Sequence, residues 1–556
     1  MKANWIDKTV AYFSPEAGYR RAKARAGIAA SGVFGSFIGQ YGGQYTGASQ
    51  RGNLAGFNPR PGGPRSDELG SLRQLRARSR DMERNNPLAG GALASVVTNV
   101  IGAGVIPIPR LDAAILKLDP DKAAELETQI GAEFDLLAES RTIDITGDQD
   151  FYGLQDLTFR STLASGDCFS IPRFIANPAS PYELAIQVVE ADRCMNPDGR
   201  ADGTQMPGGF ELVGGCELDS YGRKVAFWFS DRHPGEVMMS GLRFERIPAY
   251  GAKTGRPLVL QHFRRTRPGQ VRGVPFLAPV IDVLLNLGRY SEAEIVAAVA
   301  NACFAITTTT PEGDGVDLAG RDEDEEAGDN GFDRGFLSPG QFANLMPGEQ
   351  LASFLPNRPN TAFDPFMLSM LRWIGVGLEI PLEVLIKHFT ASYSAARGAL
   401  IEAFKMYNAR RAWHAGSFSQ PIYEMAILEG VARGRLPDLA GALSDPAYFK
   451  AWTSCDWIGP PPGQLDEQKE VGAAKMRVDE EFSTRQEETA RLTGGDWRRK
   501  HRQRVIEERA RRNDGTIVPD QIVERDQPTV PATDVPPDDQ QAPDQPADQP
   551  ERKDAA

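Results

Sequence analysis

The sequence predicts an α+β fold, because helical and strand-like patterns occupy different stretches of the chain. Before residue 166 and after residue 279, apolar residues recur at the spacing of one face of a helix. Between residues 168 and 263, short runs rich in β-branched and aromatic residues alternate with turn signals, as antiparallel strands do. Hydrophobic residues make up 41% of the 556 residues, enough for a substantial core. A chain of this length holds about two to four domains.

Charge and cysteine content restrict the class of protein. The net charge of −13 argues against a protein that coats itself in nucleic acid. A duplex could still pass through such a protein without sticking, because few counterions would be released. The five cysteines form no CxxC pair and no disulfide framework, which predicts folding in a reducing compartment.

Targeting and membrane segments are not expected. The first residues include Trp5, Asp7 and Glu16 and lack the continuous apolar run of a signal peptide. The best apolar window, Ile295–Ile306, is shorter than the ~20 residues of a membrane helix. We therefore expect no membrane contact.

The N-terminal part is predicted to be a flexible arm that is followed by helices. Residues 1–65 are rich in Gly, Gln and Tyr and carry a basic cluster, which is typical of a flexible arm. Order is predicted from Ser66, which acidic residues follow at the positive end of a helix dipole. Three helices are predicted next, over Leu69–Arg84, Leu88–Val100 and Asp121–Glu139.

The middle of the chain combines one helix with short strands. The helix is predicted over Leu154–Ser165, and Gly166 ends it. Turn signals such as Pro197-Asp198-Gly199 separate the strands. The predicted strands are Cys168–Phe174, Leu184–Val189, Lys224–Phe229 and Leu258–Phe263.

The stretch Arg267–Ile281 is the most specific feature, because it places a proline-glycine hinge directly before a long helix. Pro-Gly is a turn dipeptide, and Gly273 permits either a close approach of another segment or a positive φ. A proline is also compatible with the first turn of a helix. The hinge residues are Pro268, Gly269, Gly273, Pro275 and Pro279. The helix Val280–Ile306 follows and would span about 40 Å at ~1.5 Å per residue.

After this helix the pattern changes again. The acidic stretch Glu312–Asp329 is interpreted as a solvated loop, because the ligand spacing of a calcium loop is missing. Short strands around Phe336 and Leu351 and the loop Pro356–Pro365 come next. The helices predicted after them are Phe366–Gly375, Ala391–Trp413, Gln420–Gly434 and Asp445–Trp452. In the second of these, one face carries the apolar stripe of a core or a subunit contact: Tyr393, Leu400, Phe404 and Tyr407.

The C-terminal part is strongly charged. One charged helix is predicted over Asp466–Leu492 and a basic one over Asp496–Arg512. Residues 513–556 are rich in Pro, Asp and Gln, with eleven acidic residues against three basic. Such a segment buries too little apolar surface to order itself, so a disordered tail is predicted.

Motifs of catalysis are missing from the sequence. The chain has no Gly-x4-Gly-Lys-Ser/Thr, His-Glu-x-x-His or Gly-x-Ser-x-Gly pattern, and its five histidines are far apart. A nuclease could hold metal ions with Asp144, Asp148 and Asp150, but Gly147 between them favours a turn. We expect no catalytic residue, no cofactor and no bound metal.

Basic residues gather before the long helix and in the C-terminal helix. They could contact DNA phosphates, or they could pair with acidic residues of a neighbouring subunit. The negative net charge favours the second interpretation. The candidates are Arg264, Arg265, Arg267, Arg272, Arg397, Arg498 and Arg499.

Several segments resemble, in order, the lambda-type family of phage portal proteins, and the hinge with its long helix is the most specific. Asn85-Asn86-Pro87 resembles the start of the family's opening helix, and Leu163–Phe169 is similar to its helix-to-strand turn. The other similar segments are Val189–Arg193, Glu217–Val225, Leu345–Glu349, Pro356–Pro359, Tyr393–Arg397 and Trp457–Pro460. The resemblance extends from about Ser66 to Arg512. Glu467-Gln468 stand where the family often has a proline before its Lys-Glu pair.

The resemblance implies a portal fold with an α/β wing, a long-helix stem, a small strand-rich clip and a helical crown. It implies a ring, usually of twelve subunits, at one vertex of the virion capsid, assembled in the host cytoplasm. Double-stranded DNA would pass through the ring without sequence specificity. The implied partners are the terminase large subunit, the major capsid protein and head-completion or tail adaptor proteins. Portals carry no ATPase of their own, which agrees with the missing phosphate-binding loop.

The family order also predicts the domain organisation. Residues 1–65 would be the arm, 66–188 the first part of the wing, 189–265 the clip, 266–310 the hinge and stem, 311–390 the second part of the wing with the acidic and tunnel loops, 391–512 the helical wing and crown, and 513–556 the tail. The DNA-tunnel candidates are Arg289, Arg358, Asn360 and Thr361. Two alternatives remain open, another head–tail adaptor and a metal-dependent nuclease.

Overall fold

The computed structural model describes most of the chain between residues 56 and 516. The described stretches are residues 56–236, 241–303, 363–389, 393–436, 445–463 and 466–516, with isolated residues at 12, 14, 16, 48, 54, 307, 308, 343, 344 and 439. The chain divides into two compact units, Met1–Glu68 and Leu69–Ala556, and the second contains almost all described helices and strands. The predicted arm and tail therefore lie largely outside the described residues.

The four helices predicted in the first part of the chain are confirmed. They are α3 (Pro64–Asn85), α4 (Pro87–Val100), α6 (Pro120–Ala138) and α7 (Phe151–Ser165). The Asn86 side chain caps α4 by accepting from the N–H groups of Leu88 and Ala89 at 3.0 and 3.1 Å. Gly166 ends α7 with a φ of +90°. One further short helix is not predicted by the sequence pattern, namely α5 (Ala113–Leu116).

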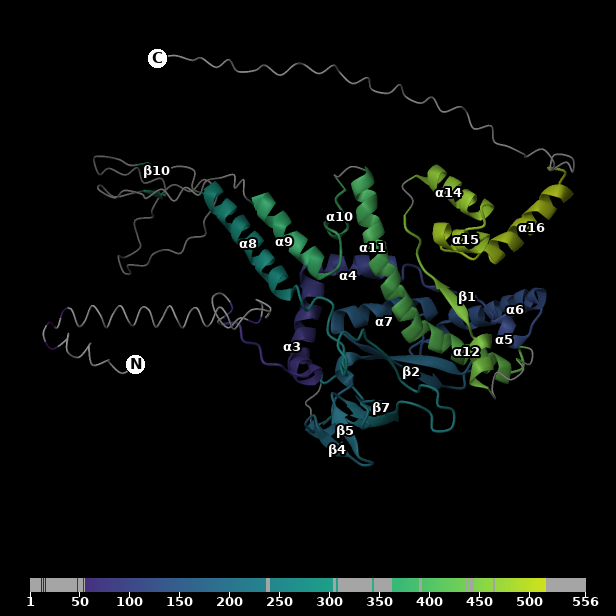
Figure 1. Cartoon of the computed structure of the whole chain (residues 1–556), viewed down its shortest axis with the longest axis horizontal. Helices are drawn as coiled ribbons and strands as arrows, with labels where there is room; N and C mark the ends of the chain where they lie inside the picture. The colour runs from purple at the N-terminus through teal and green to yellow at the C-terminus, as the bar shows by residue number, and fades with distance from the viewer. Residues whose placement is uncertain are drawn as a thin grey trace, which may run out of the picture. The chain divides into compact units, whose positions relative to one another are not determined.

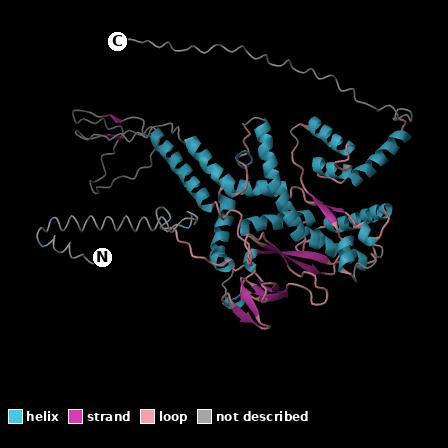
Figure 2. Cartoon of the chain, viewed as in Figure 1, coloured by secondary structure: helices cyan, strands magenta, loops and turns pink. Residues whose placement is uncertain are grey.

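Antiparallel strands form the two larger sheets, as predicted (Figure 2). The three-stranded sheet has the order β3-β2-β9, and its strands are β2 (Cys168–Phe174), β3 (Leu184–Glu190) and β9 (Leu260–His262). In the five-stranded sheet the strands lie in sequence order. The sequence pattern predicts β7 (Lys224–Ser230). It misses the shorter strands β4 (Thr204–Met206), β5 (Phe210–Val213), β6 (Cys216–Leu218) and β8 (Phe244–Pro248).

The domain boundary predicted after residue 188 falls inside β3. On β2, Phe169 and Ile171 pack into the same core cluster as Phe227 and Phe229 of the five-stranded sheet. The ring centroids of Phe169 and Phe229 are 5.2 Å apart. The strand-rich stretch therefore shares a strand and a core with the preceding residues.

The long helix after the hinge is confirmed as α8 (Ile281–Cys303). The last residues of the predicted range, 304–306, lie outside the described residues. It packs against α9 (Phe363–Gly377), and the two helices lie side by side in Figure 1. The short helix α10 (Leu382–Leu385) follows. Two-residue strands, β10 (Thr307–Thr308) and β11 (Ala343–Asn344), pair in parallel. The predicted acidic loop, the strands around Phe336 and Leu351 and the loop Pro356–Pro365 lie outside the described residues.

The next helices run into one another without a loop. Helix α11 (Tyr393–His414) continues through the π-helical turn Ala415–Ser419 into α12 (Gln420–Ala432). Of the predicted stripe on α11, Tyr407 is buried, and Leu400 and Phe404 are partly buried against the same core. Helix α13 (Pro446–Trp452) leads into β12 (Cys455–Ile458), which pairs with β1 (Ile106–Pro109). The first and last parts of the large unit are joined in this way.

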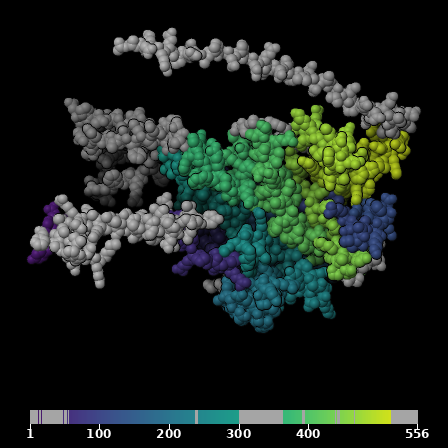
Figure 3. Space-filling view, in the orientation of Figure 1, coloured from purple at the N-terminus to yellow at the C-terminus, as the bar shows by residue number. Residues whose placement is uncertain are grey.

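The charged C-terminal helix predicted as one piece is two helices, α14 (Glu467–Asp479) and α15 (Arg485–Thr493). The break has a local cause. Thr484 and Glu487 form a capping box, and Glu481 has a φ of +60°, which a continuous helix excludes. The basic helix is confirmed as α16 (Trp497–Asn513). In the space-filling view of Figure 3, α9 and α11 (green) and α14–α16 (yellow-green to yellow) lie on the same face.

Two large apolar cores support these elements. One gathers side chains of α4, α7, α8, α9 and α11, and the other gathers side chains of α6, α12 and α13. Each core combines residues from the first and the last third of the chain, which binds these thirds together. Among the described residues, no helix has the length and apolar character needed to cross a membrane.

Candidate functional site

The hinge segment, Arg267–Ile281, begins with a tight turn that its sequence dictates. Gly269 has a φ of +79°, and the Gln270 N–H donates to the Arg267 carbonyl at 3.2 Å, as expected for a turn with glycine in the third position. The side-chain oxygen of buried Gln270 accepts from the Thr266 N–H at 2.8 Å. The turn is thus closed by backbone and side chain, and the residues that follow it are buried.

Gly273 is required by close packing. Its φ lies outside the left-handed region, so the interpretation that it takes a positive φ is wrong. A Cβ atom at Gly273 would clash with the carbonyl oxygen of Gly166 and would lie 2.8 Å from the Cβ of Phe263. A Cβ atom at Gly166 would in turn lie 2.6 Å from the carbonyl carbon of Gly273. The alternative interpretation, a close approach of two backbones, is confirmed.

Arg272 lies in the core, with 3% of its surface exposed. Its Nε donates to Asp167 Oδ2 at 2.5 Å, and its Nη2 donates to Oδ1 at 3.1 Å. The same guanidinium donates to the carbonyls of Ala191, Cys194 and Gly214 at 2.6, 2.6 and 2.7 Å. Because its donors are all directed inward, Arg272 is not available to DNA or to a neighbouring subunit. The prediction that it is a surface contact residue is wrong.

A second arginine, Arg76 of α3, reaches the same carboxylate. Its Nη2 lies 2.7 Å from Asp167 Oδ1, and its Nε donates to the Ser165 carbonyl at 2.9 Å. Burial alone would raise the pKa of Asp167, but Arg272 and Arg76 hold it below its usual value. Burial lowers the pKa of Arg76, whereas for Arg272 the attraction of Asp167 outweighs burial and raises the pKa. These charges connect α3, the α7–β2 turn and the hinge segment.

The cluster continues to the surface through Asp192. Arg80 pairs with Asp192 and, at 2.9 Å, with Glu190, and His233 Nε2 lies within 3.6–3.7 Å of both carboxylates. Within the described part of the chain, Glu190, Asp192 and His233 are the one group with the geometry of possible metal ligands. Arg80 already supplies positive charge between the two carboxylates, so a cation would be repelled there. The group is a salt-bridge cluster.

The base of α8 is fixed to the core. The Phe276 N–H donates to the Leu163 carbonyl at the end of α7 at 2.8 Å. Leu277, Leu284 and Leu287 are buried in the same core as α4 and α9. This anchoring sets the direction in which α8 leaves the hinge.

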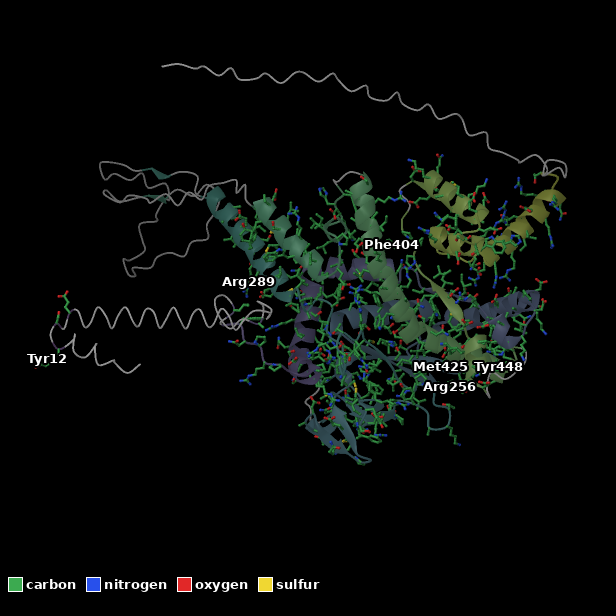
Figure 4. All side chains as sticks on the ribbon, viewed as in Figure 1. Tyr12, Arg256, Arg289, Phe404, Met425 and Tyr448 are labelled. Atoms are coloured by element: carbon green, nitrogen blue, oxygen red, sulfur yellow. The ribbon has the colours of Figure 1, made fainter. Side chains whose placement is uncertain are left out.

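The outer part of α8 presents apolar side chains to solvent. Ile295, Val296 and Val299 are 61%, 62% and 57% exposed, and Trp373 and Val376 of α9 are exposed as well. Contiguous exposed apolar residues of this kind mark an interaction surface. Arg289, a predicted tunnel residue labelled in Figure 4, is exposed on the same helix.

The other tunnel candidates, Arg358, Asn360 and Thr361, lie outside the described residues. The remaining basic candidates differ in their surroundings. Arg264 lies 3.9 Å from Glu379, and the guanidinium of Arg265 lies 5.8 Å from the centre of the Phe263 ring.

The C-terminal arginines make contacts inside the chain. Arg498 pairs with Glu127, and Arg499 pairs with Asp135, both on α6. Burial raises the pKa of the Asp135 carboxyl, and Arg499 opposes that effect. In this way α16 is attached to the first part of the chain. Arg267 and Arg397 are exposed, and Arg397 lines a groove described below.

Two of the three aspartates considered for metal binding, Asp144 and Asp150, have structural roles. Asp144 accepts from the N–H groups of Asp148 and Gln149 at 3.2 Å each. Asp150 caps α7 by accepting from the Gly153 N–H at 2.8 Å. The interpretation of this stretch as a turn is confirmed.

Residues 50–411 match the family model of the lambda-family phage portal protein. The chain belongs to this family. It is a portal protein of the phage head.

Named relatives cover most of the chain. Portal protein B of Escherichia phage lambda is 23% identical over 504 residues, which are 87% of this chain and 92% of that protein. The portal protein of Escherichia phage N15 is 23% identical over 513 residues, with the same two shares. A probable portal protein of Halomonas phage phiHAP-1 is 24% identical over 416 residues, or 73% and 74% of the two chains. A solved structure of the neck of a native GTA particle, computed with C12 symmetry, aligns at 13% identity and a TM-score of 0.36, covering 77% of this chain and 98% of that one.

Two histidines of this portal protein meet in the core, although they are far apart in sequence. The rings of His262 on β9 and His414 on α11 are fully buried, with centroids 6.3 Å apart. His262 Nε2 lies 2.8 Å from Ser170 Oγ, and Phe418 packs on both rings. Burial lowers the pKa of His262 to about 3 and that of His414 well below its usual value. Both rings are therefore neutral near pH 7.

The buried charges that hold the hinge are not evident from the sequence. Arg76 and Asp167 are 91 residues apart, so spacing alone does not relate them. One sequence signal could have found Asp167. It is the only charged residue in Leu163–Phe169, whose other residues are small or apolar. A charged residue inside such a run is rarely buried unless it is paired.

Proposed function

We propose that about twelve copies of this chain form a closed ring at one vertex of the phage head. The observation that carries this proposal is the pair α8–α9, anchored at its base by the hinge segment and exposing apolar side chains farther out. In a closed ring with head-to-tail contacts, each subunit covers the exposed apolar surface of its neighbour, so no subunit is left with this surface uncovered. The family resemblance implies a stem helix directly after the hinge, which is the position of α8.

We propose that double-stranded DNA passes through the ring along α8, without sequence specificity. At ~1.5 Å per residue, the 23 residues of α8 span about 34 Å, enough to line a channel. Arg289 is exposed on this helix, and the net charge of −13 would keep the duplex from binding tightly. Arg264 and Arg265, just before the hinge, and Arg267 at its start are proposed to contact neighbouring subunits.

In this proposal the ring is part of the virion and is assembled in the host cytoplasm. Its partners are the terminase large subunit, the major capsid protein and head-completion or tail adaptor proteins. The family is a structural one. The proposal accordingly assigns the chain no catalytic residue, cofactor or metal.

A nuclease is the weaker alternative, because Asp144 and Asp150 already accept backbone hydrogen bonds. A head–tail adaptor is disfavoured by the match to the portal family over residues 50–411.

Light scattering coupled to size-exclusion chromatography tests the ring. We expect a particle of about twelve times the 60.7 kDa subunit mass, and a negative-stain image with a central hole. A monomer or dimer under every condition would contradict the proposal. Metal-dependent DNA cleavage that is lost in Asp148→Ala would favour the nuclease instead.

A further inference from the structure

A groove of about 840 Å³ lies between α11 and the C-terminal helices α14 and α15. Its apolar lining comes from three elements. Phe404 belongs to α11 and is labelled in Figure 4, Trp457 belongs to β12, and Leu492 belongs to α15. Three consecutive prolines, Pro460–Pro462, complete this lining. An aromatic and proline-lined groove is suited to an extended, proline-rich peptide.

The groove is also basic. Its charged lining residues are Arg397, Lys405, Arg411, Lys469, Arg477 and Arg491, against the single acid Glu470. Three of the six basic residues have carboxylate partners, namely Lys405 with Glu402, Lys469 with Asp466 and Arg477 with Glu488. Among the described residues, no carboxylate lies within ion-pair distance of Arg397 or Arg491, and both are exposed. The groove therefore retains an excess of positive charge.

Arg411 adds a third positive charge on the inner side of the groove. Its guanidinium donates to the carbonyls of Asn99, Val100 and Pro460 at 2.8, 3.0 and 2.9 Å. Burial lowers its pKa to about 10, so it is still charged at neutral pH. These acceptors are neutral, which leaves the charge of Arg411 free to attract an acidic ligand.

The C-terminal segment of the chain has the complementary composition. Residues 522–539 contain five acidic residues, one basic residue and four prolines, together with Ile522, Val523, Val530 and Val535. Helix α16 starts beside α15 and is 17 residues long, or about 25 Å at ~1.5 Å per residue. At about 3.3 Å per extended residue, roughly eight residues after Asn513 would bring the chain back to the groove. Residues from about 521 onward are therefore within reach.

We propose that residues 522–539 bind in this groove of the same chain as an extended acidic peptide. Its carboxylates pair with Arg397 and Arg491, and its prolines and valines pack on Phe404 and Trp457. This inference goes beyond the proposed ring function, because the contact is made within one subunit and needs no neighbour.

Binding of a fluorescent peptide with the sequence of residues 522–539, followed by fluorescence anisotropy, tests this proposal on the full-length chain. The wild-type chain should bind it weakly, because its own tail occupies the groove. A full-length variant with Glu524→Gln, Asp526→Asn, Asp534→Asn, Asp538→Asn and Asp539→Asn should bind it at least about tenfold more tightly.

Charge reversal in the groove provides the second measurement. In the neutral-tail variant, Arg397→Glu with Arg491→Glu should weaken peptide binding at least about tenfold, and added salt should weaken it further. Arg485→Glu is the matched control, because Arg485 is exposed on α15 but does not line the groove. It should leave the affinity unchanged.

Equal affinity of the wild-type and neutral-tail chains would overturn the proposal, and so would unchanged binding in the Arg397→Glu and Arg491→Glu variant. Binding by monomers but not by larger particles would also overturn it, since a neighbouring subunit would then fill the groove. Particle mass is measured on the same samples by light scattering. Loss of the ring is thus distinguished from loss of the peptide contact.

Discussion

Asp167 accepts hydrogen bonds from Arg76 and Arg272 and has no contact with solvent. A carboxylate in this position is stable only while its partners remain, because the core offers no water to replace them. Removing one partner of a buried ion pair typically costs about 3–5 kcal/mol. Two arginine side chains therefore help to fix the hinge segment, Arg272 from the hinge itself and Arg76 from a helix about 200 residues earlier.

Replacing Arg272 tests this role. Arg272→Ala should lower the free energy of unfolding by about 3–5 kcal/mol, because buried Asp167 loses one of its two arginine partners and three carbonyls lose a donor. Urea unfolding followed by circular dichroism measures the change. Arg78→Ala, an exposed arginine on α3, is the matched control and should change the free energy by less than about 0.5 kcal/mol. Equal effects of both substitutions would contradict the assignment.

The contact between Gly273 and Gly166 makes a second prediction. Gly273→Val should damage folding and assembly, because its Cβ overlaps the Gly166 carbonyl, and Gly273→Ala should already cost about 1–3 kcal/mol. Gly288→Ala is the control, because nothing lies within 4 Å of a Cβ there. Inside an exposed helix it should stabilise the chain by about 0.5–1 kcal/mol. Thermal unfolding and particle mass are the measurements, and a stable Gly273→Val ring would refute the packing argument.

Only part of the hinge structure can be predicted from its sequence. The turn at Pro268-Gly269 follows from local backbone preferences, so it is correctly predicted. Arg272 is misjudged as a surface residue because its partner is 105 residues away. Burial of a charge depends on such distant partners, and no local pattern reports them.

At the scale of elements, α8 combines a buried base with an exposed outer part. Leu284 and Leu287 are buried, whereas Ile295, Val296 and Val299 are exposed. The length and boundaries of helices like this follow from their own apolar periodicity, which explains why α8 is predicted within a few residues of its ends. The split between α14 and α15 is missed, because a capping box at Thr484 can start a new helix inside a charged run.

The three-residue strands β4 and β6 are missed for another reason. Three residues are too few to show the alternation of apolar and polar side chains that predicts a strand. The position of such a short strand is set instead by pairing with its neighbouring strands.

The exposed part of α8 makes a prediction about assembly. Val296→Glu should shift the particle mass toward the monomer, because it places a charge in the proposed contact between subunits. The thermal unfolding of the monomer should not change, since the side chain is exposed. Ile506→Glu on α16 is the control, with a similarly exposed apolar residue on another surface. Intact rings in Val296→Glu would show that this face is not the contact.

At the scale of the whole molecule, the two buried histidines predict a dependence of stability on pH. His262 and His414 stay neutral in the folded chain, because burial lowers their pKa, in His262 to about 3. In the unfolded chain histidine titrates near pH 6.5. Below that pH the unfolded state binds protons that the folded state does not, so stability falls as the pH decreases toward 3 and is unaffected by these groups above about pH 7. Each histidine contributes about 1.4 kcal/mol per pH unit in this window.

Urea unfolding between pH 7.5 and pH 5 measures this dependence. His414→Phe should reduce its slope, because one titrating ring is removed from an aromatic environment. His388→Gln is the control, since His388 is exposed. An unchanged slope in His414→Phe would contradict the prediction.

The fold class and the family were predictable from sequence, because helical periodicity and the order of similar segments extend over most of the chain. The domain boundary predicted after residue 188 falls inside β3, which pairs with β2 and shares a core with the five-stranded sheet. Pairing between distant strands is a property of the whole chain rather than of any segment.

The anchoring of α8 has a geometric consequence for its far end. A helix of about 34 Å fixed at one end is a lever arm. A rotation of about 5° at Gly273 would move the tip by about 3 Å, close to the width of a side chain. The carboxylate of Asp167 and the two facing glycines therefore control a dimension tens of ångströms away from them. Substitutions there that leave the subunit folded should alter the bore of any ring built from these helices.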